Sequence, residues 1–165
     1  GDAGNDHLYG GAGNDFLDGG ANTFATDGGG NHLYGGAGND VLVFHQGDTI
    51  DGGSGTDMLL VKGGSVDALF DSDGKLNSNI SNTEILISGK ENGTVESLTD
   101  VGKLSDIGMT VGSDGKVTTA NTSNATWADS GTHGDYNVMT CTITHTDSSS
   151  EEVTVAVLKT TLNNG

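Results

Sequence analysis

A repeat with a period of nine residues occupies the first 60 positions of the chain and limits what the chain can fold into. Pairs of adjacent glycines begin at residues 10, 19, 28, 35 and 52, so their spacings are 9, 9, 7 and 17, the last being one unit of nine and one of eight. The segment divides into the units 1–9, 10–18, 19–25, 26–34, 35–43, 44–51 and 52–60. Units this short cannot bury a core alone, so neighbouring units must stack.

Each unit has a turn-forming part followed by three residues with an apolar residue at their centre. We expect a very short strand there, with the central side chain inside the stack and its two neighbours pointing outward. A flexible glycine-rich linker would need no apolar residue at every ninth position. The inward residues are Leu8, Leu17, Phe24, Leu33, Leu42, Ile50 and Leu59.

Successive units are expected to alternate between two edges. The first, third, fifth and seventh units then lie along one edge, and the second, fourth and sixth along the other. The third unit is short, and residues 19–34 divide either as seven plus nine or as nine plus seven. We adopt the first division because it turns Phe24 inward. Either division leaves open whether Asp6 finds a partner in the third unit.

The position two residues before the inward residue, which is the sixth position of a complete nine-residue unit, carries an oxygen-bearing side chain in every unit: Asp6, Asp15, Asn22, Asn31, Asp40, Asp48 and Asp57. Residues 1–61 contain nine aspartates and no lysine. Rows of carboxylates stacked about 4.8 Å apart would repel one another. Calcium would remove this repulsion, since it accepts six to eight oxygens in flexible geometry, including main-chain carbonyls of glycine turns, whereas magnesium demands a strict octahedron.

These units resemble the RTX nonapeptide G-G-x-G-x-D-x-U-x, and the copies at 1–9, 10–18, 35–43 and 52–60 are nearly perfect. The resemblance implies a parallel β-roll over residues 1–60 that binds several calcium ions, roughly three to five, each between turns two repeats apart. Asp40 and Asp57 then make the best site. Asp15 with Asn31, and Asn31 with Asp48, make weaker sites on the opposite edge.

Main-chain carbonyls in the glycine turns complete these sites in the resembling family. For the site of Asp40 and Asp57, the carbonyls lie near Gly36, Gly38, Gly52 and Ser54. The full set of metal ligands that the resemblance implies comprises Asp6, Gly11, Gly13, Asp15, Gly28, Asn31, Gly36, Gly38, Asp40, Asp48, Gly52, Ser54 and Asp57.

Beyond residue 61 the pattern changes to ordinary strands and turns. Strands are predicted over 80–87 and 107–111, the second followed by a turn at 113–115. Residues 97–104 are predicted to form one short helix capped by Ser97. Residues 138–145 and 153–157 form a hairpin, with threonines on one face and Met139, Cys141 and Ile143 on the other.

The predicted fold class is therefore all-β, with two domains. Residues 1–60 form the parallel β-roll of nonapeptide repeats. Residues 61–165 form a mainly antiparallel β cap or small sandwich, which covers the open end of the roll.

The segment ISNTEILISG at 80–89 resembles the C-terminal region of large bacterial adhesins that are exported by type I secretion. This resemblance implies an uncleaved export signal in residues 61–165, contact with the type I secretion machinery, and folding by calcium outside the cell. The parent protein is then secreted, extracellular or at the bacterial cell surface, and acts in adhesion or biofilm formation. The alternative is the calcium-binding tail of a secreted RTX enzyme, such as a protease, lipase or epimerase, or of a toxin.

Composition and motifs exclude several other classes of function. The chain of 165 residues has a formal charge of −17, from 23 acids against 6 bases, which argues against binding nucleic acid. It has no apolar run of 18 residues, so no direct membrane insertion is expected, and we expect a monomer. Cys141 stands alone and is predicted to be a buried structural thiol. No catalytic motif is found, so we expect no enzyme.

Overall fold

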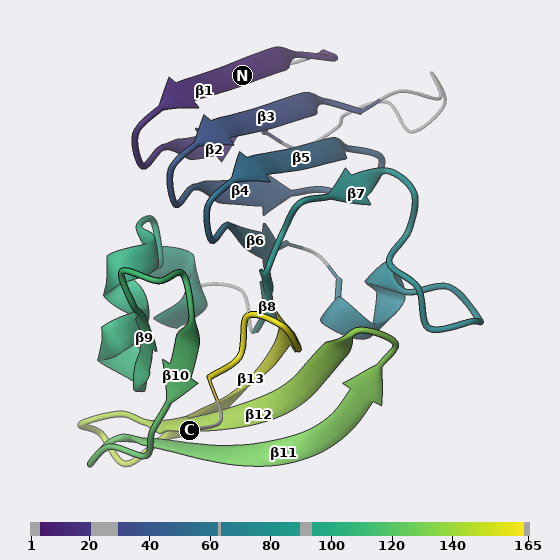
Figure 1. Ribbon diagram of the computed structural model, residues 1–165. Coiled ribbons are helices and arrows are strands. Elements are labelled where there is room, and N and C mark those ends of the chain that lie inside the picture. Colours follow the sequence, from purple (N-terminus) through teal and green to yellow (C-terminus); the bar gives the residue numbers. More distant parts are fainter. Residues whose placement is uncertain (1–3, 21–29, 63, 90–93, 164–165) are drawn as a thin grey trace.

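The computed structural model describes residues 4–20, 30–62, 64–89 and 94–163. Two parallel sheets face each other at one end of the molecule, and a curved antiparallel hairpin lies at the other (Figure 1). The fold is mostly β, with parallel sheets followed by an antiparallel region, as the sequence predicts. The first sheet contains β1 (His7–Ala12), β3 (His32–Ala37), β5 (Thr49–Ser54) and β7 (Ile80–Ser81); the parallel part of the second contains β2 (Phe16–Asp18), β4 (Val41–Phe44), β6 (Met58–Val61) and β8 (Ile85–Ser88).

The strands confirm the stacking of the repeats but correct the predicted edges. His7 pairs with His32, and His32 pairs with Thr49, so the first, fourth and sixth units form one sheet. The second, fifth and seventh units form the other. The predicted alternation is wrong because β3, which contains the strand residues of the fourth unit, lies in the sheet of β1 and β5, and not in the sheet of β2. Phe24 lies outside the described residues.

The predicted inward side chains fill the space between the two sheets. Leu8 packs partly buried at the end of this cluster. The fully enclosed members from the repeats are Leu17, Leu33, Leu42, Ile50 and Leu59. The prediction of one inward residue per unit is therefore confirmed for every unit whose central residue the structure describes.

The segment 80–87 forms two strands instead of the predicted single strand. Asn82 adopts φ 50°, in the left-handed region, and the chain turns there. β7 then pairs with β5 in the first sheet, and β8 pairs with β6 in the second. The parallel stack thus receives a further turn from outside the repeats. The division into 1–60 and 61–165 stays a prediction, although strand pairing crosses residue 60.

β8 also connects the parallel stack to the antiparallel part of the chain. One edge of β8 pairs parallel with β6, and the other pairs antiparallel with β13 (Ser150–Leu158). β13 pairs antiparallel with β12 (Tyr136–Thr144), and β12 pairs antiparallel with β11 (Ala125–His133). The hairpin predicted near the C-terminus is confirmed, with Met139, Cys141 and Ile143 buried on one face of β12. One seven-stranded sheet therefore runs through both parts of the molecule.

The remaining cap contains short 3-10 helices and a small hairpin. The hairpin joins β9 (Met109–Val111) to β10 (Val117–Thr119), as predicted. The predicted helix over 97–104 is wrong: two helices, η2 (Thr94–Ser97) and η3 (Val101–Ile107), lie there instead, and η1 (Val66–Leu69) precedes them. Asp100 caps η3, since its Oδ1 accepts from Gly102 N at 2.7 Å, whereas the Ser97 hydroxyl donates to the carbonyl of Thr94.

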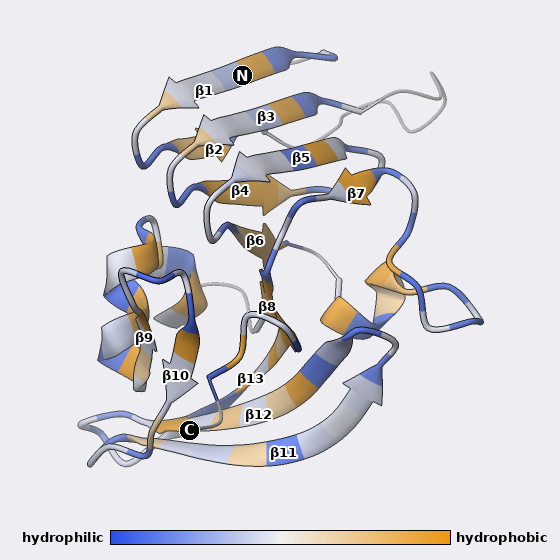
Figure 2. Ribbon diagram, in the orientation of Figure 1, coloured by the Kyte–Doolittle hydropathy of each residue, from blue (hydrophilic) through white to orange (hydrophobic). Residues whose placement is uncertain are grey.

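The outer faces of the two parallel sheets have different surroundings. On the first sheet, the rings of Tyr9 and Tyr34 stack in the open at 4.8 Å, and Tyr9 is 71% exposed. On the second sheet, the outward residues of β4 and β6, expected at the surface, are buried under the cap, in a core formed by Val41, Val43, Met58, Leu60 and apolar residues of the cap. Figure 2 shows β4 in apolar colours beside mostly polar turns. The cap therefore completes the core of the roll.

Three glycine turns, at residues 10–15, 35–40 and 52–57, stack closely. Gly13 N donates to the Ala37 carbonyl at 2.7 Å, and Gly38 N to the Ser54 carbonyl at 2.9 Å. Gly38 has φ 133°, and a Cβ there would lie 1.9 Å from the carbonyl oxygen of Gly13. Gly13 has φ 120°, but a Cβ there would meet nothing within 4 Å, because it lies in the outermost of these three turns.

We predict that Gly38→Ala destabilises the protein more than Gly13→Ala. Both alanines are strained by about 1–3 kcal/mol, because the positive φ favours glycine. Gly38→Ala costs about 1–3 kcal/mol more, because its methyl group pushes two turns apart. Urea denaturation of both variants in calcium measures the difference. Equal losses of unfolding free energy would contradict the close stacking of the turns.

We predict that a fragment ending at Lys62 needs about tenfold more calcium to fold than the full chain, or does not fold. Removing the cap exposes the outer faces of β4 and β6, and each large apolar side chain contributes about 1.5–3 kcal/mol when buried. Circular dichroism during a calcium titration of both chains gives the two midpoints. The same midpoint for the fragment and the full chain would show that the cap contributes nothing to folding of the roll.

Candidate metal centre

The two edges of the roll are built from different turns. The turns at 10–15, 35–40 and 52–57 all have a Gly-Gly-x-Gly-x-Asp sequence and lie on one edge, which we call the Asp40 edge. The turns that end at Asp6, Asn31 and Asp48 lie on the other, which we call the Asp48 edge. Three of the four best copies of the repeat therefore stack directly on one another.

The carboxylates of the Asp40 edge form a ladder with the backbone of neighbouring turns. Asp15 N donates to Asp40 Oδ1 at 2.7 Å, and Asp40 N donates to Asp57 Oδ1 at 2.8 Å. The ladder continues beyond the repeats, because Asp57 N donates to Glu84 Oε2 at 2.8 Å. Each of these carboxylates therefore uses one oxygen to hold the turn stacked on it.

The second oxygen of each aspartate in this ladder is buried without compensation. The Oδ2 atoms of Asp15, Asp40 and Asp57 have no hydrogen-bond partner among the residues that the structure describes. Asp40 and Asp57 are 0% exposed. Burying a carboxylate oxygen without a partner is costly, so these atoms are strong candidates for ligands of a cation.

A main-chain carbonyl of the next turn lies beside each of these unpartnered oxygens. The position of a Cβ on Gly35 would be 2.5 Å from Asp40 Oδ2 and 2.4 Å from the Gly52 carbonyl oxygen. For Gly10, the corresponding distances are 2.7 Å to Asp15 Oδ2 and 2.5 Å to the carbonyl oxygen of Gly35. Such pairs of oxygens are close enough for one calcium ion, which binds oxygen at about 2.3–2.6 Å, to contact both. The residues present thus fit calcium.

Burial also changes the pKa values of the aspartates in this ladder. Burial, together with the nearby carboxylates of Glu84, Asp40 and Asp51, raises the pKa of Asp57 to about 7, although the hydrogen bond from Asp40 N acts in the opposite direction. Burial also raises the pKa of Asp40. The ionised form of these carboxylates is therefore unfavourable unless a positive charge lies beside them.

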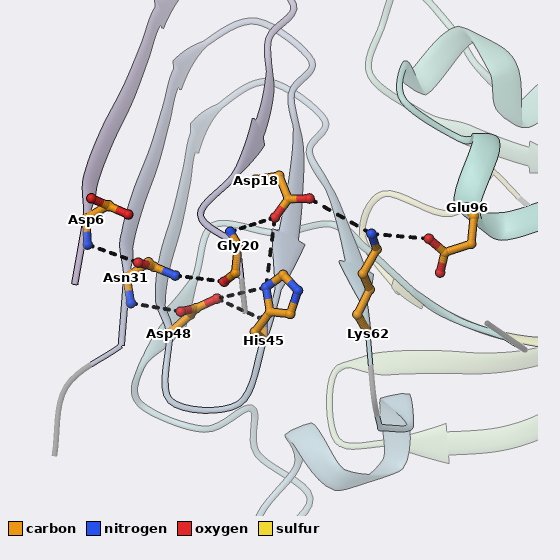
Figure 3. A network of polar contacts seen from close by, with 8 residues as sticks. All are labelled: Asp6, Asp18, Gly20, Asn31, His45, Asp48, Lys62 and Glu96. Atoms are coloured by element: carbon orange, nitrogen blue, oxygen red, sulfur yellow. Dashed lines mark hydrogen bonds and ion pairs between the residues drawn. The ribbon is translucent and has the colours of Figure 1, made fainter. Parts of the chain in front are cut away.

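On the Asp48 edge, Asn31 and Asp48 are hydrogen-bonded mainly by the chain itself, whereas Oδ2 of Asp6 is buried with no hydrogen-bond partner among the described residues (Figure 3). Asp6 N donates to Asn31 Oδ1 at 2.9 Å, and Asn31 N donates to Asp48 Oδ1 at 2.8 Å. Asp48 Oδ2 accepts a hydrogen bond from His45 N at 2.8 Å. Asp48 therefore has a backbone donor on each oxygen, and its neighbour Asn31 carries no charge.

Two basic side chains, those of His45 and Lys62, also lie beside this edge. His45 Nδ1 lies 3.7 Å from Asp48 Oδ2 and 3.9 Å from Asp18 Oδ1 (Figure 3). Lys62 Nζ lies 3.9 Å from Asp18 Oδ2 and 3.2 Å from Glu96 Oε2. Lys62 thus offsets part of the negative charge of Asp18 beside this edge.

The structure brings together some of the predicted ligand pairs and separates others. Asp40 lies beside Asp57, and Asn31 beside Asp48, as predicted. The predicted pair of Asp15 with Asn31 is wrong, because the two residues lie on opposite edges, and Asp15 contacts Asp40 instead. Asp6 has Asn31 as its neighbour.

The predicted carbonyl ligands lie in the turns of the Asp40 edge: Gly11, Gly13, Gly36, Gly38, Gly52 and Ser54. Gly28 lies outside the described residues. The binding of calcium by any of these residues stays a prediction. Sequence reasoning did not include Glu84 among the ligands; the signal for it was a single acid directly before an apolar strand, as in the repeats.

Side chains alone do not make a metal site in the described part of the chain. No group of three or more histidines, cysteines, aspartates and glutamates is close enough there to hold an ion. A calcium site on the Asp40 edge would therefore combine two carboxylates with main-chain carbonyls, which is the donor set that calcium accepts.

Cys141 is 0% exposed, and burial raises its pKa to about 11, so it is a buried thiol as predicted.

Comparison with known proteins identifies the repeats. Residues 1–23, 18–48 and 47–65 match the family described as RTX calcium-binding nonapeptide repeat (4 copies). No curated protein and no solved structure matches the chain. Within the described residues, no helix is long and apolar enough to cross a membrane. The N-terminal region of this chain, residues 1–65, therefore consists of RTX calcium-binding nonapeptide repeats.

Proposed function

We propose that this chain is a module that folds when it binds calcium outside the cell, and that it acts as a binding module and not as an enzyme. The observation that carries this proposal is the column of buried Oδ2 atoms on Asp15, Asp40 and Asp57, which have no partner within the described structure. Neighbouring carbonyls complete the oxygen ligands. The stacked state therefore needs a cation that the unfolded chain does not need.

Calcium then stabilises the protein through linkage between binding and folding. An ion that binds only the stacked turns shifts the folding equilibrium toward them, by an amount that grows with its concentration. Extracellular calcium modules bind at about 10⁻⁴–10⁻³ M. The chain therefore stays unfolded where calcium is scarce and folds where calcium is abundant, which suits a protein that crosses a secretion channel unfolded.

For the parent protein, we propose a bacterial adhesin exported by type I secretion, in which this module nucleates folding and stabilises the C-terminal region during adhesion or biofilm formation. The support is the resemblance of residues 80–89 to that class, together with repeats that are typical of secreted proteins. The sequence that precedes these repeats in the parent gene tests the proposal. Tandem immunoglobulin-like repeats would support an adhesin, and a catalytic or toxin domain would support the alternative.

We predict that the β structure of residues 1–62 forms only with calcium, with a midpoint of about 10⁻⁴–10⁻³ M. The unpartnered carboxylates of the Asp40 edge, on Asp15, Asp40 and Asp57, must be neutralised before their turns stack. Circular dichroism of the full chain during a calcium titration, starting in EDTA, measures the transition. Magnesium at the same concentrations serves as the control and is expected to give a much weaker response. A complete β spectrum in EDTA would contradict the proposal.

We predict that Asp40→Asn raises the calcium midpoint about tenfold, which corresponds to about 1.4 kcal/mol of binding free energy. Asparagine keeps the oxygen that accepts from Asp15 N but removes the charge from the ladder. Asp106→Asn is the matched control, because Asp106 is exposed on η3 and loses the same charge away from the turns. Equal midpoints for the two variants would show that Asp40 is not a calcium ligand.

A further inference from the structure

The turn between β7 and β8 stacks on the last glycine turn of the Asp40 edge, although it lacks the nonapeptide pattern. It comprises Asn82, Thr83 and Glu84, and the strands on either side pair with β5 and β6. The match to the repeat family ends at residue 65, before this turn. We propose that Asp57, Glu84 and the main-chain carbonyl of Asn82 bind a further calcium ion at the end of the Asp40 edge that faces the cap. This inference rests on the calcium-binding function proposed above and extends it beyond the repeats.

Glu84 occupies the position that an aspartate occupies in the repeats. Its Oε2 accepts from Asp57 N at 2.8 Å, and Asp57 Oδ1 accepts from Asp40 N at the same distance. Glu84 N and Ile85 N both donate to the carbonyl of Asp57, at 3.1 and 3.0 Å. Met58 N donates to the carbonyl of Asp40 in the same way, at 2.8 Å. The step from Asp57 to Glu84 therefore repeats the step from Asp40 to Asp57.

The carbonyl of Asn82 repeats the role of a glycine carbonyl. A Cβ on Gly52 would lie 2.0 Å from the Asn82 carbonyl oxygen and 2.7 Å from Asp57 Oδ2. One turn earlier, a Cβ on Gly35 would lie 2.4 Å from the Gly52 carbonyl oxygen and 2.5 Å from Asp40 Oδ2. The same pair of oxygens, one carboxylate and one carbonyl, is thus present at both levels.

Asp57 carries a buried carboxylate oxygen to which the described residues offer no partner. Asp57 is 0% exposed, and its Oδ2 has no hydrogen-bond partner among the described residues. The hydroxyl of Thr83 is buried without a partner as well, in the turn itself. An ion between Asp57 and Glu84 would compensate both the buried oxygen of Asp57 and the repulsion between the two carboxylates.

Solvent ions have access to this end of the edge. An open cleft of about 600 Å³ lies between the turns of the Asp40 edge and the turn at 112–116, and Gly55, Thr56 and Glu84 line it. Lys116 also lines the cleft, but its Nζ donates to the carbonyl of Thr160. The described structure shows no ion pair between this amine and Glu84, whose carboxylate lines the cleft while its Oε2 accepts from Asp57 N.

The test counts calcium ions on the natural chain and on the Glu84→Gln variant by native mass spectrometry at saturating calcium. Glutamine keeps an oxygen that accepts from Asp57 N and removes the charge. We expect one ion fewer in the variant, or one ion bound at least tenfold more weakly, with the other sites unchanged. Asp106→Asn is expected to keep the full number of ions. The same number and affinity in Glu84→Gln as in the natural chain would overturn the inference.

A crystal structure of the natural chain grown with calcium decides the question if Glu84→Gln does not fold. An ion that contacts Asp57 Oδ2 and the Asn82 carbonyl oxygen supports the inference. An ion between Asp40 and Asp57, with none between Asp57 and Glu84, overturns it and leaves the proposed function intact. A folded chain with no ion at any turn overturns the proposed function itself, and this inference with it.

Discussion

The hydrogen bond from each aspartate N–H to the carboxylate of the next turn controls the geometry of the Asp40 edge. It holds successive turns at the spacing of neighbouring strands and turns one oxygen of every carboxylate toward the backbone. The second oxygen is then enclosed between turns, where the described protein offers it no donor. The stacking that buries the apolar core therefore also creates a column of uncompensated charge, and a divalent cation with many oxygen ligands removes it.

The two edges of the roll meet this problem in different ways. The Asp40 edge keeps intact glycine turns, whose exposed carbonyls can share an ion with the carboxylates. The Asp48 edge has a neutral Asn31 in its column, a backbone donor on each oxygen of Asp48, and Lys62 beside Asp18 (Figure 3). The Asp40 edge thus leaves an unpartnered carboxylate oxygen on each of its aspartates, while the Asp48 edge is hydrogen-bonded by its own chain at Asn31 and Asp48 and leaves Oδ2 of Asp6 without a partner in the described structure.

The cap provides the apolar side chains that cover the outer face of the second sheet of the roll. Its strands continue the second sheet through β8 and β13, and its side chains cover the outer faces of β4 and β6. A core formed from both segments makes their folding cooperative, because neither face is buried without the other. The proposed calcium sites at the turns and the apolar packing against the cap therefore act on the same set of strands.

The sequence by itself determined the repeat, the inward residue of each described unit and the oxygen-rich chemistry of the turns, and its resemblance to the RTX nonapeptide implied the parallel roll. The first three follow from local periodicity and residue type, as Leu33 and Leu42 illustrate by lying in the core. It also predicted the C-terminal hairpin from the alternation of Met139, Cys141 and Ile143 with threonines. In such segments the side-chain period alone decides which face is buried.

Only the tertiary structure decided which turns share an edge. β3 joins the sheet of β1, so Asn31 lies on the opposite edge from Asp15, and Asp15 meets Asp40 instead. No local pattern encodes this, because it depends on how many residues the chain uses to cross between the sheets. The same holds for Glu84, which is separated from Asp57 by a long excursion of the chain and becomes its neighbour only when β8 adds to the sheet. Contacts of this kind depend on the pairing of distant strands, and the sequence of either strand carries no record of its partner.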